Sequence, residues 1–469
     1  MSKKPSEVIE EKFPFEPTDG QRKLFSLFDK FLFSKDATRP TLMLKGYAGT
    51  GKTSVLIALV KALPRFDHKF VLLAPTGRAA KVIAAYTKRK AFTIHKLVYQ
   101  RTADLLSGKI EFKRRKNYSK NTLFVVDESS MISDEVGLSG DSLLYDLITY
   151  VFSGKSNKLM LIGDTAQLPP VKQILSRGLD HEYLAYEYRL DMTTIELSEV
   201  KRQNLQSGIL YNATSLRNEL SNKSAKIQFQ TSNFSDTFRM PANKLEDGLR
   251  YVYKKYGIEN SVIVSRSNRE AVQYNEYVRR NILFFENEIE AGDLLMVVKN
   301  NYYFLGEDTP AGFLANGDFV EILRVVDFEE IHNLRFATLE MRLVDYPEQH
   351  PFEAKVILDT LHAHTPALPE ELHQQLYQSV LEDYQDEDGK KAQMEAVRND
   401  MYLNALQVKF AYALTCHKSQ GGQWEAVFVS QGYLKDDMID QEYLRWLYTA
   451  ITRAKSELFL MNFQPKFFI

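Results

Sequence analysis

The stretch "GYAGTGKT" at residues 46–53 has the glycine spacing of a loop that wraps around phosphate groups. The apolar run before it predicts a strand, and "SVLIALV" after it predicts a helix whose N-terminus would face an anion. Lys52 would reach the β- and γ-phosphates of a nucleotide, and the Thr53 hydroxyl would bind Mg²⁺. The predicted nucleotide contacts in this loop are Gly46, Gly49, Thr50, Gly51, Lys52 and Thr53.

A second candidate element is "LFVVDE" at residues 123–128. Its four apolar residues predict a buried strand that delivers Asp127 and Glu128 to its carboxyl end, where ligands bind in open α/β sheets. Asp127 suits the Mg²⁺ shell, and Glu128 suits a general base that orients and deprotonates water. Two carboxylates with two tasks indicate nucleotide hydrolysis; the alternative is a pair of solvated acids at a strand end.

Short apolar strands alternate with helical stretches in both halves of the chain, which favours parallel α/β sheets. Between 292 and about 357, alternating runs with Gly and Asn turns predict a small antiparallel barrel. The insertion at 98–121 predicts a hairpin that turns at Ser107 and Gly108. The expected sheet strands are 41–44, 70–74, 123–126, 159–162, 261–265, 410–414, 426–429 and 458–461.

These elements predict an α/β protein with two parallel-sheet domains that carry insertions. The first domain covers 1–195 and holds the short hairpin insertion at 98–121. The second domain is formed by 196–291 together with 405–469. Residues 292–404 form its insertion, a small barrel followed by a polar helical segment.

Composition narrows the classes of protein that the chain can belong to. With 469 residues and a formal net charge of -1, it is not a generally basic protein, so nucleic-acid contacts must come from local patches. The single cysteine, Cys416, excludes a disulfide framework and indicates a reducing compartment. No apolar run predicts a membrane span, and the N-terminus lacks an apolar signal segment. We therefore expect a cytoplasmic protein without membrane contact.

Further short motifs follow in a fixed order along the chain. They are "APTGRAAKV" at 74–82, "TIHKL" at 93–97, "LIGDTAQLPPV" at 161–171, "EVKRQ" at 199–203, "LTCHKSQGGQW" at 414–424 and "YTAITRAK" at 448–455. With the two phosphate elements, this series resembles the motif set of superfamily 1 DNA helicases, and it is most similar to the RecD/Dda group. The resemblance spans residues 21–455. It implies two RecA-like domains, an SH3-like barrel in the second domain, and the use of ATP and Mg²⁺.

The resemblance also assigns nucleotide roles to five residues. Gln21 resembles the glutamine that recognises adenine, since a side-chain amide can pair with N6 and N7 together. Gln167 matches the glutamine that contacts the γ-phosphate and couples it to the DNA site. Arg202 and Arg453 match the arginines that neutralise the transferring phosphoryl group when the domains close. Gln423 departs from the pattern, because many relatives carry a glutamate that meets the ribose there.

Polar loop residues match family positions near a DNA backbone, where hydroxyls and amides hold phosphates without reading sequence. The matching residues are Thr76, Arg78, Thr93, His95, Ser265, Asn268, Asn275, His417 and Ser419. For each of them, an ordinary polar loop residue is the alternative. The basic stretch 107–120 is either a solvated loop or a strand-separating pin at a duplex fork, as in Dda-like relatives. In the second case Phe112 or Tyr118 would be the wedge.

The resemblance implies an ATP-dependent DNA helicase or translocase that moves 5′→3′ on single-stranded DNA, separates duplex and acts as a monomer. Three alternatives stay open. One is a translocase that remodels nucleoprotein with little unwinding. Another is the motor subunit of a RecD-like complex of the exonuclease V type, and the last is an RNA helicase. Replication or repair proteins are the expected protein partners.

Overall fold

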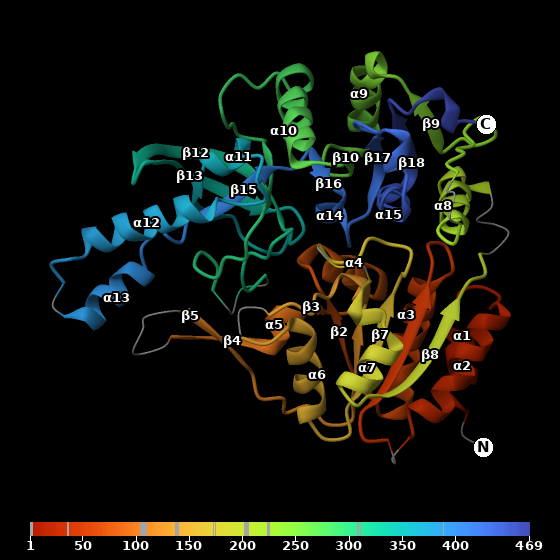
Figure 1. Ribbon diagram of the computed structural model, residues 1–469. Coiled ribbons are helices and arrows are strands. Elements are labelled where there is room, and N and C mark those ends of the chain that lie inside the picture. The colour runs from red at the N-terminus through yellow and green to blue at the C-terminus, as the bar shows by residue number, and fades with distance from the viewer. Residues whose placement is uncertain are drawn as a thin grey trace.

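The computed structural model describes residues 3–34, 37–103, 110–136, 140–171, 173, 175–200, 206–222, 226–306, 309, 311–387 and 389–469. Figure 1 shows two α/β lobes, one above the other, and a barrel beside the upper lobe. We call these parts the first lobe, which holds the N-terminus, the second lobe, which holds the C-terminus, and the barrel. Among the described residues, no helix is both long and apolar enough to cross a membrane.

The first lobe is built on a six-stranded parallel sheet in the order β3-β2-β6-β7-β1-β8. Its strands are β1 (Pro40–Gly46), β2 (Lys69–Ala74), β3 (Ala91–Thr93), β6 (Thr122–Val126), β7 (Lys158–Gly163) and β8 (Asp191–Leu197). Its helices are α1 (Pro5–Lys12), α2 (Asp19–Phe31), α3 (Lys52–Ala62), α4 (Gly77–Thr87), α5 (Ile94–Val98), α6 (Leu143–Ser153) and α7 (His181–Glu187). One apolar core lies under α1 to α4 and another under α5 to α7, on opposite faces of the sheet. Strands covered on both faces explain the continuous apolar runs in the sequence.

The second lobe has a five-stranded parallel sheet in the order β16-β10-β17-β18-β9. Its strands are β9 (Thr237–Met240), β10 (Ser261–Ser265), β16 (Ala413–Thr415), β17 (Trp424–Ser430) and β18 (Ala454–Met461). Its helices are α8 (Gly208–Glu219), α9 (Leu245–Tyr256), α10 (Asn268–Tyr277), α14 (Cys416–Ser419) and α15 (Gln441–Ile451). The two-sheet α/β architecture is confirmed, although β3, β8 and β9 were not expected from the sequence. All three are edge strands, and an edge strand needs no continuous apolar run.

The barrel is closed by five strands in the order β11-β12-β13-β14-β15. They are β11 (Leu294–Val297), β12 (Phe319–Ile331), β13 (Leu334–Leu343), β14 (Phe352–Ile357) and β15 (Leu406–Phe410). Helices α11 (Asp359–His362), α12 (Glu370–Asp383) and α13 (Lys390–Arg398) lie between β14 and β15 in the chain.

Two predictions about the barrel were wrong. The expected strand 410–414 is divided, because Phe410 ends β15 in the barrel and Ala413 begins β16 in the second lobe. The barrel is not purely antiparallel, because β15 runs parallel to β14 while it pairs antiparallel with β11. The physical reason is closure: a strand that returns after α13 fills the gap between β11 and β14 and pairs both open edges.

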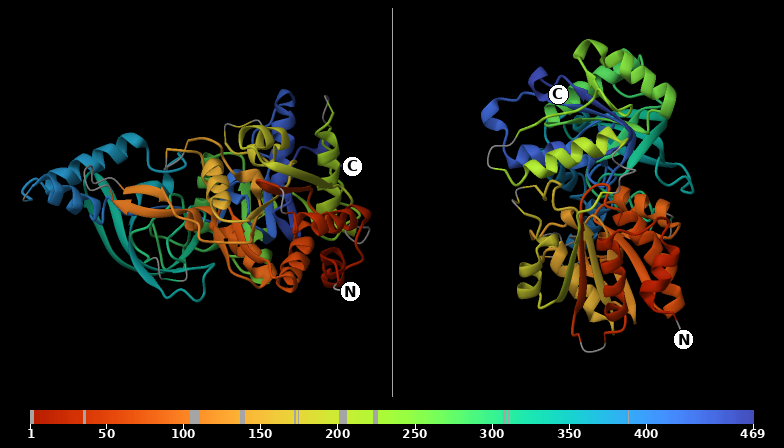
Figure 2. Two further views of the ribbon diagram at one scale, coloured as in Figure 1. Left: turned by 90° about the horizontal axis from the view of Figure 1, so that it is seen from below. Right: turned by 90° about the vertical axis from the view of Figure 1, so that its right-hand side faces the viewer.

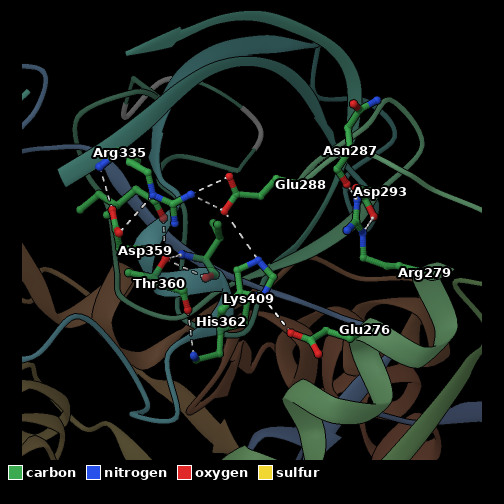
Figure 3. A network of polar contacts seen from close by, with 12 residues as sticks. Glu276, Arg279, Asn287, Glu288, Asp293, Arg335, Asp359, Thr360, His362 and Lys409 are labelled. Atoms are coloured by element: carbon green, nitrogen blue, oxygen red, sulfur yellow. Dashed lines mark hydrogen bonds and ion pairs between the residues drawn. The ribbon is translucent and has the colours of Figure 1, made fainter. Parts of the chain in front are cut away.

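The barrel is attached firmly to the second lobe (Figure 3). Arg279, which follows α10, holds Asp293 through two bonds of 2.8 Å at the start of the barrel. On β13, Arg335 binds both oxygens of Glu288 at 2.9 and 2.8 Å, and His362 lies 3.7 Å from the same carboxylate. Strands of the barrel and of the second sheet also share one apolar core. We call this unit the barrel–second-lobe body.

A two-stranded hairpin leaves the first lobe on the side of the barrel (Figures 1 and 2). It consists of β4 (Tyr99–Ala103) and β5 (Ile110–Arg114), with Tyr99 opposite Arg114. The predicted insertion is therefore a hairpin, although the turn expected at Ser107 and Gly108 lies outside the described residues.

Candidate nucleotide and nucleic-acid sites

The phosphate loop follows β1 and leads directly into α3, as the sequence predicts. Gly51 caps α3 with φ 86°, and Gly49 has φ 77°, a left-handed backbone that favours glycine. A Cβ atom on Gly51 would lie 2.6 Å from the Nε2 atom of Gln21. Lys52 Nζ donates to two loop carbonyl oxygens at 2.7 and 2.9 Å, so its ammonium group lies over the loop. Thr53 is exposed on the first turn of α3.

Gln21 lies on α2 and is 3% exposed against the phosphate loop. Its Nε2 group donates to the Thr50 carbonyl oxygen, and its Oε1 atom accepts from the Thr18 N–H, each at 3.0 Å. The second bond belongs to a helix capping box. One amide N–H and one oxygen lone pair remain after these bonds. Gln21 thus ties α2 to the phosphate loop, and its contact with adenine stays a prediction.

The two acidic residues follow β6 at the carboxyl end of the sheet. Burial raises the pKa of Asp127 to about 7; the Glu128 carboxylate adds to the rise, and the Glu128 N–H and the Lys52 ammonium oppose it. Glu128 itself has φ 52°, a conformation that is uncommon outside glycine. A carboxylate that is costly to ionise in this position is one that a divalent cation would stabilise.

A carboxylate that the sequence reasoning did not single out lies at the centre of the site. Asp164 is 1% exposed, and its Oδ2 atom lies 4.0 Å from Lys52 Nζ. The same Oδ2 accepts a 2.7 Å hydrogen bond from the hydroxyl of Tyr448, on α15 of the second lobe. That hydroxyl in turn accepts a 2.8 Å bond from the Ala48 N–H of the phosphate loop. Asp164 and Tyr448 lie within the motifs "LIGDTAQLPPV" and "YTAITRAK". The sequence therefore showed both motifs but did not predict that these two residues contact each other.

A cavity of about 390 Å³ lies beside Asp164, and Gln167 lines it together with Lys45, Ser130 and Arg445. The Oε1 atom of Gln167 is buried and has no hydrogen-bond partner among the described residues. Arg445, also on α15, donates to the Thr165 carbonyl oxygen across the boundary between the lobes. Gln167 thus has an unsatisfied amide oxygen, and its contact with the γ-phosphate and its coupling to the DNA site stay predictions.

Two other predicted nucleotide residues, Arg453 and Gln423, lie in the second lobe. Arg453 is 3% exposed and donates to the carbonyl oxygens of Thr449 and Gly422 at 2.9 and 3.3 Å. Both acceptors are neutral, so neither cancels the charge of the guanidinium. Gln423 accepts a 2.8 Å bond from the hydroxyl of Tyr86, on α4 of the first lobe. Arg202 lies outside the described residues.

A groove of about 910 Å³ separates the first lobe from the barrel–second-lobe body. Five residues predicted to contact DNA line it: Thr76, Arg78, Thr93, His95 and His417. The barrel and the segment just before β15 add Lys299, four asparagines and the rings of Tyr302 and Phe313, which stack at 4.7 Å between centroids. Cations, amides and aromatic faces are the groups that hold a single strand without reading its sequence.

The remaining DNA-contact predictions fall away from this groove. Ser265 and Ser419 are fully buried, and each donates its hydroxyl to a backbone carbonyl oxygen. Asn275 bonds the carbonyl oxygen and the N–H of Ala413, and so fixes α10 against β16. Asn268 begins α10 and is not among the residues that line the groove. The DNA roles of these four residues stay predictions.

The hairpin residues give a mixed result. Phe112 lies on β5, and its role as a wedge stays a prediction. Tyr118 is 83% exposed after the hairpin. Arg114 donates to Asp146 at 2.6 Å, so this member of the basic stretch holds the hairpin to α6 instead of facing solvent freely.

The residues present fit a nucleoside triphosphate with Mg²⁺. The loop offers backbone N–H groups and the Lys52 ammonium to phosphate oxygens. The Thr53 hydroxyl and the Asp127 carboxylate are oxygen donors of the kind that Mg²⁺ prefers. The unpartnered Gln167 oxygen and the raised pKa of Asp127 both indicate a site whose polar groups are incompletely satisfied by the protein alone. A phosphate loop in one parallel-sheet lobe, contacted by a helix of a second such lobe, defines a two-lobed P-loop nucleotide hydrolase.

Comparisons with known proteins agree with this class. The family model described as an AAA domain matches residues 29–232, and the UvrD-like helicase C-terminal domain matches residues 410–461. An uncharacterized protein of Acanthamoeba polyphaga mimivirus is 25% identical over 92% of this chain and 97% of its own length. The ATP-dependent RecD2 DNA helicase of Deinococcus radiodurans is 33% identical over 37% of this chain and 21% of its own length. The ATP-dependent DNA helicase Dda of Enterobacteria phage T4 is 23% identical, over 65% of this chain and 67% of its own length.

A solved structure of Pif1 helicase from Bacteroides is 14% identical and covers 97% of this chain and 95% of that chain, with a TM-score of 0.48. The matched part of the chain spans about a fifth of RecD2 and about two thirds of Dda. An AAA domain model thus matches residues 29–232 and a UvrD-like helicase C-terminal domain model matches residues 410–461, and the chain is similar to the DNA helicases RecD2 and Dda.

Proposed function

We propose that this protein is an ATP-dependent DNA helicase that moves 5′→3′ along single-stranded DNA and separates duplex. One observation carries the proposal: the Tyr448 hydroxyl of the second lobe bonds both the phosphate loop and Asp164 of the first lobe. A nucleotide site shared by two lobes couples its occupancy to their relative position. The groove lies between the first lobe and the body that contains the second lobe, so the same movement acts on a bound strand.

Each residue of the nucleotide site has a task that its position permits. The phosphate loop and Lys52 bind and neutralise phosphate oxygens, while Thr53 and Asp127 hold Mg²⁺. Glu128 orients water and takes its proton. We assign Arg453 to the transferring phosphoryl group, which it would reach from the second lobe when the lobes close, since its hydrogen-bond acceptors Thr449 and Gly422 are neutral. Bound ATP with Mg²⁺ supplies the phosphoryl group whose hydrolysis drives the cycle.

Single-stranded DNA and a duplex fork are the proposed nucleic-acid partners. The groove supplies cations and stacked rings, which bind a strand through its backbone and base faces. Because one chain contains both halves of the nucleotide site, we propose that it acts as a monomer. The polarity comes from the resemblance to the RecD/Dda group.

Two duplexes test the proposal, one with a 5′ single-stranded tail and one with a 3′ tail, each with ATP and Mg²⁺. Unwinding of only the 5′-tailed duplex is expected, and the Glu128→Gln variant should unwind neither. Unwinding from the 3′ tail would overturn the polarity and keep the motor. If neither duplex opens while single-stranded DNA still stimulates ATP hydrolysis, the protein is a translocase with little unwinding activity.

A further inference from the structure

Arg78 was expected to touch DNA, yet its guanidinium lies against two aromatic rings of the barrel–second-lobe body. Its Cζ atom is 4.3 Å from the ring centroid of Phe319, at the start of β12, and 4.3 Å from that of Trp424, at the start of β17. Both rings are buried, at 3% and 2% exposed. The two rings also contact each other edge to face, with centroids 6.4 Å apart and planes 64° apart, so the guanidinium lies in the corner that they form. Two cation–π contacts with buried rings hold it there.

A barrel carboxylate, Asp345, lies near two cations of α4. Asp345, just after β13 in the barrel, lies 3.7 Å from Arg78 and 3.3 Å from Lys81, one turn further along α4. The Lys81 ammonium also lies 5.2 Å from the ring centroid of Tyr346. The first turn of α4 thus meets the barrel through two cations, one carboxylate and two barrel rings.

Three glycines allow α4 to approach this closely. A Cβ atom on Gly77 would lie 2.2 Å from Asp318 Oδ1, on the barrel side. A Cβ atom on Gly421 would lie 2.8 Å from the Cβ of Ala79, and one on Gly422 would lie 2.4 Å from the Trp424 ring and 3.1 Å from Arg78 Nε. The contacts with Asp318, Ala79 and Arg78 join the first lobe to the barrel–second-lobe body. The "GG" of the motif "HKSQGGQW" therefore makes room for α4.

The geometry points to Arg78 as a positioning residue. Its guanidinium holds the barrel–second-lobe body against α4 of the first lobe. Thr76, the N-cap of α4, lines the groove two residues before Arg78. Any shift of the barrel–second-lobe body against α4 therefore moves a wall of the groove. The effect on DNA rests on the proposed helicase function, whereas the packing of the two bodies does not depend on it.

A direct phosphate contact by Arg78 is the competing role, and the two roles predict different results. Loss of one phosphate contact on a single strand lowers the slope of log K against log salt by about 0.7. Loss of a contact that only positions the two bodies leaves that slope unchanged. It loosens the packing of the barrel–second-lobe body against α4 even in the absence of DNA. The fluorescence of Trp424 reports how tightly the barrel–second-lobe body packs against α4. Trp424 and Trp446 are the two tryptophans of the chain, so replacement of Trp446 leaves Trp424 as the reporter.

The experiment compares Arg78→Met with Arg89→Met in a Trp446→Phe background of the full chain. Methionine keeps length and apolar surface while removing the planar charge, and Arg89, beyond the end of α4, is exposed. Acrylamide quenching of Trp424 is measured without DNA or nucleotide. Binding to a labelled single-stranded oligonucleotide is then measured over a series of salt concentrations, and thermal unfolding confirms that each variant folds.

Greater quenching of Trp424 in Arg78→Met, with an unchanged salt slope and a smaller stimulation of ATP hydrolysis by DNA, is the expected result. Arg89→Met should quench like the parent. Unchanged quenching in Arg78→Met would overturn the positioning role of Arg78. A decrease of about 0.7 in the salt slope with unchanged quenching would instead assign Arg78 to a phosphate contact. If Arg78→Met does not fold, Phe319→Leu, which removes the barrel ring, is measured by the same criteria. Failure of the parent protein to unwind DNA would affect the proposed function alone, because quenching is read without DNA.

Discussion

Removal of the Tyr448 hydroxyl should loosen the contact between the two lobes in the nucleotide-free protein. The side chain is 1% exposed, and burial raises its pKa well above the usual range, so the phenol stays protonated and donates to Asp164. In Tyr448→Phe the ring still fills its space, but the Ala48 N–H and one oxygen of Asp164 lose a partner at 2.8 and 2.7 Å. The other oxygen of Asp164 still accepts from the Ala166 N–H.

The size of the effect follows from the charge of the acceptor. A hydrogen bond to a charged group contributes about 1.5–3 kcal/mol, so the closed arrangement should weaken by about 2 kcal/mol, or roughly 30-fold in population. Other bonds between the lobes remain, including the 2.8 Å bond from the Leu168 N–H to the Thr449 hydroxyl. The lobes should therefore open more often without separating.

Single-molecule energy transfer between dyes on the two lobes measures this opening. Lys61→Cys on α3 and Lys254→Cys on α9 provide exposed attachment sites. Burial raises the pKa of the native Cys416 to about 12, which protects it from the maleimide reagent. Tyr443→Phe is the matched control, because Tyr443 lies on the same helix and its buried hydroxyl has no partner among the described residues. A transfer distribution for Tyr448→Phe that matches both parent and control would refute the reasoning.

Three further outcomes are expected. Glu128→Gln should bind a fluorescent ATP analogue like the parent and hydrolyse ATP at least about 100-fold more slowly, because the proton acceptor is lost; unchanged hydrolysis would contradict the assignment. Gly421→Ala should lower the apparent unfolding temperature more than Gly140→Ala: both glycines have positive φ, which costs about 1–2 kcal/mol in alanine, but only Gly421 would meet a neighbouring Cβ, at 2.8 Å. Burial lowers the pKa of His95, so its contribution to stability is complete above the unfolded pKa of about 6.5 and is lost as pH falls toward the lower folded value. Urea unfolding at pH 7.5 and 5.5 should show that loss, and His95→Asn should reduce it; an equal loss in both proteins would exclude His95 as its source.

Local sequence was sufficient for the parts of the fold that depend on neighbouring residues. Gly49 and Gly51 allow the positive φ angles that the loop at residues 46–53 requires. The apolar runs on either side specify the strand and the helix that hold this loop. The same reasoning placed Asp127 and Glu128 after a buried strand. Each of these features is decided within about ten residues, where backbone conformation and burial pattern act directly.

Contacts between distant segments were not available from that reasoning. The run at 410–414 is apolar throughout, and only closure of the barrel decides that it is divided between β15 and β16. Asn275 looks like a loop amide in the sequence but fixes the backbone of Ala413 in the structure. Polarity alone does not say whether a side chain faces a ligand or the backbone of a neighbouring strand.

The sequence by itself determined that this chain has a phosphate loop, a pair of acids after a buried strand and a motif order that resembles that of superfamily 1 helicases. Only the tertiary structure decided that Tyr448 contacts Ala48 and Asp164, and that Arg78 lies against Phe319 and Trp424. The physical reason is that residue type and spacing set local conformation and chemistry, whereas these meetings join segments hundreds of positions apart. They depend on how complete lobes pack, and packing is a property of the whole folded chain.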